Sequence, residues 1–127
     1  MIGYVTIGTN DPARSAAFYN AAFAPLGYAQ TFEGGGWVGY GPGGEKTGLE
    51  IYLATPANGK PATLGNGSML AFQAPNRAAV EAFHAAALAS GGSDEGAPGV
   101  RGDSSPPFYG AYVRDPEGNK LCAYFKG

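Results

Sequence analysis

A strand-like pattern of apolar and polar positions followed by a helix-like one occurs twice along this chain. A short apolar run ends at Asp11, and an Ala-rich segment follows in which Phe18 lies on the apolar side. The pattern returns further along, where Asn76 takes the place of Asp11 and Phe83 that of Phe18. Asp and Asn cap helix N-termini, so each copy predicts a strand that leads into a helix. The chain therefore contains two related modules.

Further apolar segments, separated by groups of Gly and Pro, predict three more strands in each module. The expected helices are 12–24 and 76–89, and the expected strands are 2–8, 28–33, 36–41, 48–54, 68–74, 108–114 and 120–125, with a weak strand near 93–97. Residues 96–107 are expected to form a loop. Residues 55–67 have loop composition and link module 1, about 1–54, to module 2, about 68–127, within one domain of residues 1–127.

Composition narrows the classes of function. The chain has 8 basic and 10 acidic side chains and a net charge of -2, with no Lys/Arg cluster along the sequence. We therefore expect no nucleic acid and no membrane as partners. The chain has neither a signal segment nor an apolar stretch of membrane-spanning length, so a cytoplasmic location is expected. The single cysteine, Cys122, excludes an internal disulfide and a multi-cysteine zinc site.

Two motifs connect this pattern to a known family. The helix start Asp-Pro-Ala-Arg-Ser-Ala-Ala-Phe-Tyr at residues 11–19 and the turn Arg-Asp-Pro-Glu-Gly-Asn-Lys at residues 114–120 resemble the glyoxalase/bleomycin resistance/dioxygenase superfamily, with its vicinal oxygen chelate fold. The resemblance implies an α+β fold of two βαβββ modules. These would form a partly open curved sheet or barrel with helices outside and a ligand on the concave side. Many members dimerise, so the resemblance also implies a homodimer.

The resemblance further implies where a divalent metal would bind, on the first and last strands of the modules. Relatives carry histidine on the first strands and a carboxylate on the last strands. The matching positions here are Tyr4, Met69, Glu50 and Cys122, and only Glu50 is a usual ligand. We expect no cofactor and no tightly held metal, although a non-standard metal site that includes Glu50 stays open. The one histidine, His84, falls within the second expected helix.

Side-chain alternation directs Tyr4 and Thr6 toward the expected concavity. Aromatic and hydroxyl-bearing residues there predict a lining around Glu50 that suits a planar small molecule. The same alternation directs Val38 and Tyr40 inward instead of Trp37, so the orientation of that strand stays open. The candidate ligand-binding residues are Tyr4, Thr6, Trp37, Tyr40, Tyr52, Met69, Tyr112, Cys122 and Tyr124.

Two classes of function remain from the sequence. The favoured one is a metal-free protein that binds a small organic ligand in an aromatic cavity, as antibiotic-sequestering members of the superfamily do. The alternative is a lyase or dioxygenase-type enzyme in which Glu50 is a metal ligand or a general base. A third reading is a protein whose site has decayed and which serves only in assembly.

Overall fold

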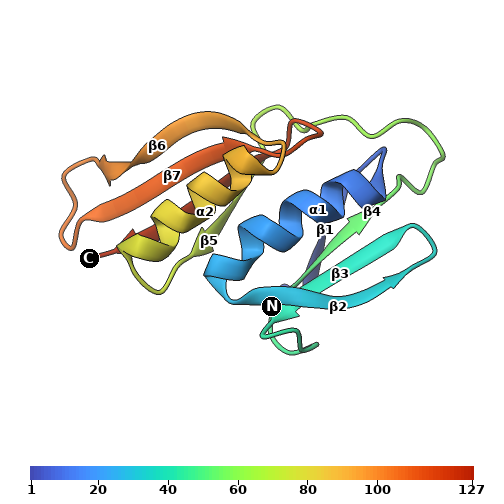
Figure 1. Cartoon of the computed structure of the whole chain (residues 1–127), viewed down its shortest axis with the longest axis horizontal. Coiled ribbons are helices and arrows are strands. Elements are labelled where there is room, and N and C mark those ends of the chain that lie inside the picture. Colours follow the sequence, from blue (N-terminus) through green and yellow to red (C-terminus); the bar gives the residue numbers. More distant parts are fainter.

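The computed structural model describes residues 1–127, and the elements follow the expected order of two modules (Figure 1). Module 1 consists of β1 (Tyr4–Gly8), α1 (Pro12–Phe23), the 3₁₀ turn η1 (Ala24–Leu26), β2 (Tyr28–Gly34), β3 (Trp37–Pro42) and β4 (Glu50–Ala54). Module 2 consists of β5 (Met69–Gln73), α2 (Arg77–Ala89), β6 (Ser93–Arg101), β7 (Phe108–Arg114) and β8 (Lys120–Lys126). No helix or strand lies between β4 and β5.

Each module forms one four-stranded sheet with the same strand order. Sheet 1 has the order β1-β4-β3-β2, and sheet 2 has the order β5-β8-β7-β6. The first and last strands of each module pair in parallel, and all other pairs are antiparallel. The strands β1 and β5 are therefore edge strands, and both border the boundary between the modules.

Both helices begin as their capping residues predict. The side chain of Asp11 accepts a hydrogen bond from the backbone N–H of Arg14, and proline follows at the first helical position. The side chain of Asn76 accepts one from the backbone N–H of Ala79. These bonds satisfy N–H groups that have no partner within the helix.

The helix-facing sides of both sheets contribute to one core. Phe18, Tyr19 and Phe23 of α1 and Phe83 of α2 are fully buried in it. The strand residues of this core are Ile7, Val38, Tyr40, Ile51 and Leu53 from sheet 1 and Val113, Leu121 and Ala123 from sheet 2. Each large apolar side chain that is removed from water stabilises the fold by about 1.5–3 kcal/mol. Because this core contains side chains from both sheets and both helices, the two modules share one core within the chain.

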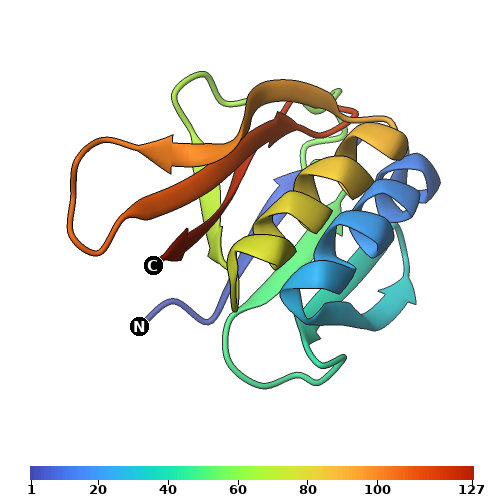
Figure 2. The same cartoon turned by 60° about the vertical axis from the view of Figure 1, so that its left-hand side comes forward.

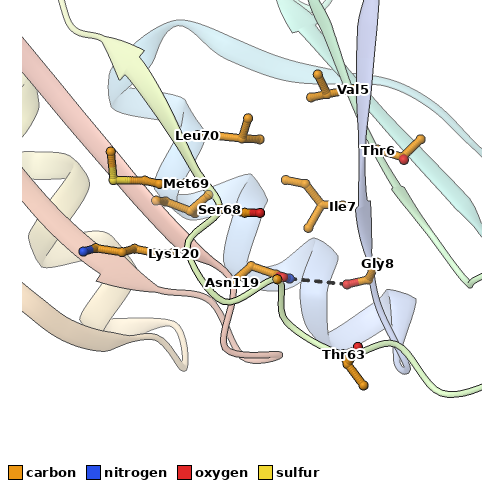
Figure 3. A pocket seen from close by; sticks show the side chains of 12 residues that line it. Val5, Thr6, Ile7, Gly8, Thr63, Ser68, Met69, Leu70, Asn119 and Lys120 are labelled. Carbon is orange, nitrogen blue, oxygen red and sulfur yellow. Dashed lines mark hydrogen bonds between the residues drawn. The ribbon is translucent and has the colours of Figure 1, made fainter.

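The two helices contact each other, and the two sheets curve around them (Figures 1 and 2). Ile7 and Leu70 point toward each other across the gap between β1 and β5, whereas Thr6 and Met69 point in opposite directions (Figure 3). The structure confirms the α+β pair of βαβββ modules and contains no closed barrel. Within a single chain, however, the helices lie inside the arc of the sheets and not outside a shared concavity.

The strand β6 is longer than the sequence predicts. It pairs with β7 from Ser93 to Arg101, although residues 96–101 were expected in a loop. Register shifts next to Gly96 and Gly99 accommodate the glycines that suggested a loop, as β-bulges do. The loop is restricted to residues 102–107.

No helix of this chain is long and apolar enough to cross a membrane.

Candidate functional site

The outer face of each sheet, meaning the face that points away from the helices, carries most of the candidate residues. On sheet 1, Tyr4 lies beside Glu50, and Thr6 lies beside Tyr52. The Tyr52 hydroxyl donates a hydrogen bond of 2.8 Å to Glu50 Oε1. The ring of Tyr52 makes edge contacts with Tyr4 and Trp37, at centroid distances of 5.6 and 5.9 Å. These residues form one aromatic cluster around a single carboxylate.

A glycine allows this cluster to form. A Cβ atom at Gly39 would lie 2.6 Å from Cε1 of Tyr52, so the ring lies directly over the backbone of β3. The hydrogen bond to Glu50 raises the pKa of Tyr52, and partial burial adds to this effect. The Tyr52 hydroxyl therefore stays protonated and remains a donor to Glu50. The outer rim is open to solvent, because Tyr4 is 60% exposed and Trp37 is 39% exposed.

The outer face of sheet 2 carries a second aromatic cluster. Tyr112 lies beside Cys122, and Tyr124 stacks on Phe108 with a centroid distance of 5.1 Å and an angle of 9°. Burial raises the pKa of the Cys122 thiol, against the opposing effects of the Tyr112 hydroxyl and of Arg101 and Lys120. Cys122 is therefore a protonated, buried thiol and not an activated nucleophile.

The register of sheet 2 corrects the sequence-based repeat by two residues. Tyr4 lies beside Glu50, but Met69 lies beside Lys120 and not beside Cys122. A shift of two residues keeps a side chain on the same face of a strand, so alternation alone does not detect it. By its position beside the first strand, the counterpart of Glu50 in module 2 is Lys120.

Tyr40 lies on the opposite side of its sheet from the other candidates. It is fully buried against α1, and its hydroxyl donates to Asn20 Oδ1 over 2.8 Å. Burial raises its pKa, with a smaller effect of Glu33. Val38 is also buried in the core, so the apolar residues of β3 face α1 and Trp37 takes the outer face. The placement of Tyr40 in a ligand cavity is therefore wrong.

The aromatic clusters of the two outer faces do not line a common cavity within one chain, although Thr6 of sheet 1 and Met69 and Lys120 of sheet 2 border the same cavity. A cavity of about 300 Å³ lies at the boundary between β1 and β5, where Asn119 Nδ2 donates to the Gly8 carbonyl over 3.4 Å (Figure 3). Neither this cavity nor the other main cavities are lined by Glu50, Tyr52 or Cys122. The aromatic residues expected around one cavity therefore form two separate clusters on different sheets, and their role in ligand binding stays a prediction.

The donors at the four positions implied by the resemblance do not fit a divalent metal. A phenol, a thioether and a buried protonated thiol are poor ligands, and Glu50 already accepts the Tyr52 hydroxyl. No group of three or more His, Cys, Asp and Glu side chains is arranged to hold a metal ion. His84 lies on α2, where Nε2 is 2.8 Å from Asp94 Oδ1. The absence of a cofactor stays a prediction.

Sequence reasoning missed a basic cluster, because its members come from different strands. Register places Arg101, Arg114, Lys120 and Lys126 on the outer face of sheet 2 together with Tyr112. These are four of the 8 basic residues of the chain. These residues are far apart in the sequence and become neighbours only when the strands pair. A search for consecutive Lys and Arg residues therefore does not detect them.

The turn between β7 and β8 has a structural role. Asp115 is buried and accepts hydrogen bonds from the Tyr19 hydroxyl, at 2.6 Å, and from the backbone N–H groups of Glu117 and Asn119, at 2.9 Å each. The Tyr19 bond attaches module 2 to α1 of module 1, and the two backbone bonds hold the turn itself.

Comparison with known proteins agrees with this fold. A model of the Glyoxalase/Bleomycin resistance protein/Dioxygenase superfamily matches residues 1–123. A glyoxalase/bleomycin resistance protein from Albidiferax ferrireducens T118 is 39% identical, with a TM-score of 0.88 over 98% of both chains. A glyoxalase-related enzyme from Fulvimarina pelagi is 20% identical, with a TM-score of 0.76 over 98% of this chain and 87% of that one, and shares the fold. None of the curated proteins matches this chain.

Proposed function

Because the chain belongs to the Glyoxalase/Bleomycin resistance protein/Dioxygenase superfamily, we propose that it binds a small organic molecule on its aromatic outer faces without a resident metal ion. The Glu50–Tyr52 pair carries this proposal. At a position where the resemblance implies a metal ligand, Glu50 accepts a hydrogen bond from a tyrosine whose ring contacts Tyr4 and Trp37. Exposed rings around one acceptor suit a planar ligand that carries a donor group.

A second copy of the chain completes the site in this proposal. Tyr4, Trp37 and Met69 are 60, 39 and 43% exposed, which is unusual for large apolar side chains gathered on sheet faces. The two faces are also complementary in charge, since one carries Glu50 and the other carries Lys120. In a two-fold dimer, sheet 1 of one protomer faces sheet 2 of its partner, and two equivalent sites result.

An enzyme that uses Glu50 as a general base is the second candidate. One oxygen of Glu50 is held by Tyr52, and the other has no hydrogen-bond partner in the protein. A carboxylate in this state accepts a proton from a bound ligand, provided that the ligand has an acidic group within reach. Turnover of a bound compound that is lost in Glu50→Gln, with binding retained, distinguishes this candidate from simple binding.

Metal analysis tests the first half of the proposal. The protein is purified without chelator, its metal content is measured, and its melting temperature is recorded with Ni²⁺, Zn²⁺, Fe²⁺ and Mn²⁺. We expect no stoichiometric metal and no stabilisation, because a ligand raises stability only if it binds the folded state. Near-stoichiometric metal that disappears in Glu50→Gln contradicts the proposal.

A neutral aromatic compound tests the second half. We expect 2-naphthamide to raise the melting temperature in chelator-containing buffer and to shift the NMR signals of Trp37, whose ring contacts Tyr52. Tyr52→Ala should abolish both effects, because it removes the central ring of the cluster. Leu88→Ala is the matched control, since Leu88 is 40% exposed but lies on α2. Equal losses in both variants would show that binding does not involve the outer face.

A further inference from the structure

The geometry points to an aromatic anion as the ligand, with its anionic group held by Arg101 and Lys120 on the outer face of sheet 2. This inference rests on the proposed function and adds the chemical class of the ligand. In a chain of net charge -2, half of the basic residues lie on one sheet face.

Two of these cations converge on one ring. Arg101 Cζ lies 5.5 Å from the centroid of Tyr112, and Lys120 Nζ lies 5.4 Å from the same centroid. Both cations also act on the neighbouring Cys122 thiol, which lies beside Tyr112 in the sheet. Because both cations lie near this ring, an anion that binds beside Tyr112 and Cys122 is attracted by two positive charges.

The protein leaves both of these charges without a carboxylate. Arg114, on the same face, forms an ion pair with Glu95 at 2.8 Å. The other ion pairs of the chain involve Arg14 and His84, so neither Arg101 nor Lys120 has an acidic partner. The positive charge at Tyr112 is therefore available to an external anion.

Arg101 is held in position by the backbone of its own strand. Its Nη2 atom donates to the Ala97 carbonyl over 2.6 Å. Its guanidinium lies so close to Gly96 and Gly99 that a Cβ atom at either would be 3.1 Å from a guanidinium nitrogen. The glycines that disturb the register of β6 thus make room for this side chain. A preorganised guanidinium loses less conformational entropy when it binds a ligand and favours planar, bidentate partners such as carboxylates.

The surroundings select an aromatic anion over a simple inorganic one. Tyr112, Tyr124 and Phe108 supply ring surface beside the two cations. In the proposed dimer, the aromatic cluster of sheet 1 closes the site from the other side and presents Glu50. A ligand with a carboxylate at one end and a hydroxyl or amine donor at the other matches both halves.

Matched probes test the inference in the full-length protein. Dissociation constants of 2-naphthoate and of the neutral 2-naphthamide are measured by isothermal titration calorimetry. We expect naphthoate to bind about tenfold more tightly, because a hydrogen bond between charged groups contributes about that much. The naphthoate preference should fall with added NaCl.

Charge-removing variants locate the anionic group. Arg101→Gln and Lys120→Gln should each weaken naphthoate binding by about tenfold and change naphthamide binding by less than about twofold. Lys60→Gln, at an exposed residue of the linker, should change neither. Circular dichroism confirms that each variant is folded. Equal binding of the two probes, or equal effects of Lys60→Gln and Lys120→Gln, overturns the inference and leaves the proposed function intact. If neither probe binds, the proposed function fails and the inference fails with it.

Discussion

At the scale of single residues, a buried hydrogen bond from Tyr19 to Asp115 links the two modules. Tyr19 is fully buried, and burial followed by the effect of Asp115 raises its pKa well above the ordinary value, so the hydroxyl remains a donor. Tyr19→Phe removes this donor from a buried carboxylate. We expect the free energy of unfolding, measured with urea, to fall by about 1.5–3 kcal/mol, the range for hydrogen bonds to charged groups.

Tyr28→Phe provides the comparison for this loss. The Tyr28 hydroxyl donates to the Leu49 carbonyl over 2.9 Å at an exposed position. Its removal should cost about 1 kcal/mol or less, because water replaces the lost partner. A loss in Tyr28→Phe as large as that in Tyr19→Phe would mean that the Tyr19–Asp115 bond is not a special link between the modules.

At the scale of elements, Glu117 fixes the start of α1 to the turn between β7 and β8. Burial tends to raise its pKa, but hydrogen bonds from the backbone and side chain of Asn10 and from Arg14 outweigh burial and lower it. A carboxyl whose pKa is lowered in the folded state stabilises the fold above its unfolded pKa, about 4.3, and this contribution is lost as the pH falls through the lowered value. We expect the stability difference between the unchanged protein and Glu117→Gln to shrink as the pH falls from about 7 to about 3.

Urea unfolding at a series of pH values measures this difference. Glu45→Gln is the control, since Glu45 is exposed and forms no ion pair, and its effect should be small throughout. A Glu117→Gln difference that grows toward low pH would contradict the assigned role.

The elements also show what a sequence can predict. The capping residues and the spacing of apolar positions predict both helices and most strands, because these signals are local in the sequence. Alternation correctly assigned Tyr4 and Thr6 to one face of β1. It did not resolve which face of β3 is buried, since Trp37 and Tyr40 are both large aromatic residues. The last part of β6 was missed because Gly96 and Gly99 accommodate Arg101 within a strand instead of ending it.

At the scale of the whole molecule, the relation between the two sheets was beyond the reach of the sequence. Alternation determines which face a residue occupies but carries no information on how two sheets are oriented to each other. The shared core turns the helix-facing sides of both sheets inward, so the outer faces diverge. Residues that the repeat places in one concavity therefore lie on two separate sheet faces of the chain, and the basic residues come together only when β6, β7 and β8 pair.

This divergence leads to a prediction about assembly. If a second copy covers the outer faces, sedimentation equilibrium should show a dimer, and Trp37→Ala should weaken it by about thirtyfold, since truncation of a central aromatic residue at an interface typically costs 2 kcal/mol or more. Leu88→Ala removes a similarly exposed apolar side chain from α2 and should leave the dimer unchanged. A dimer that is weakened by Leu88→Ala and not by Trp37→Ala would place the interface on the helices. A chain that stays monomeric at all concentrations would leave both outer faces open, and a ligand would then have to bind to one face alone.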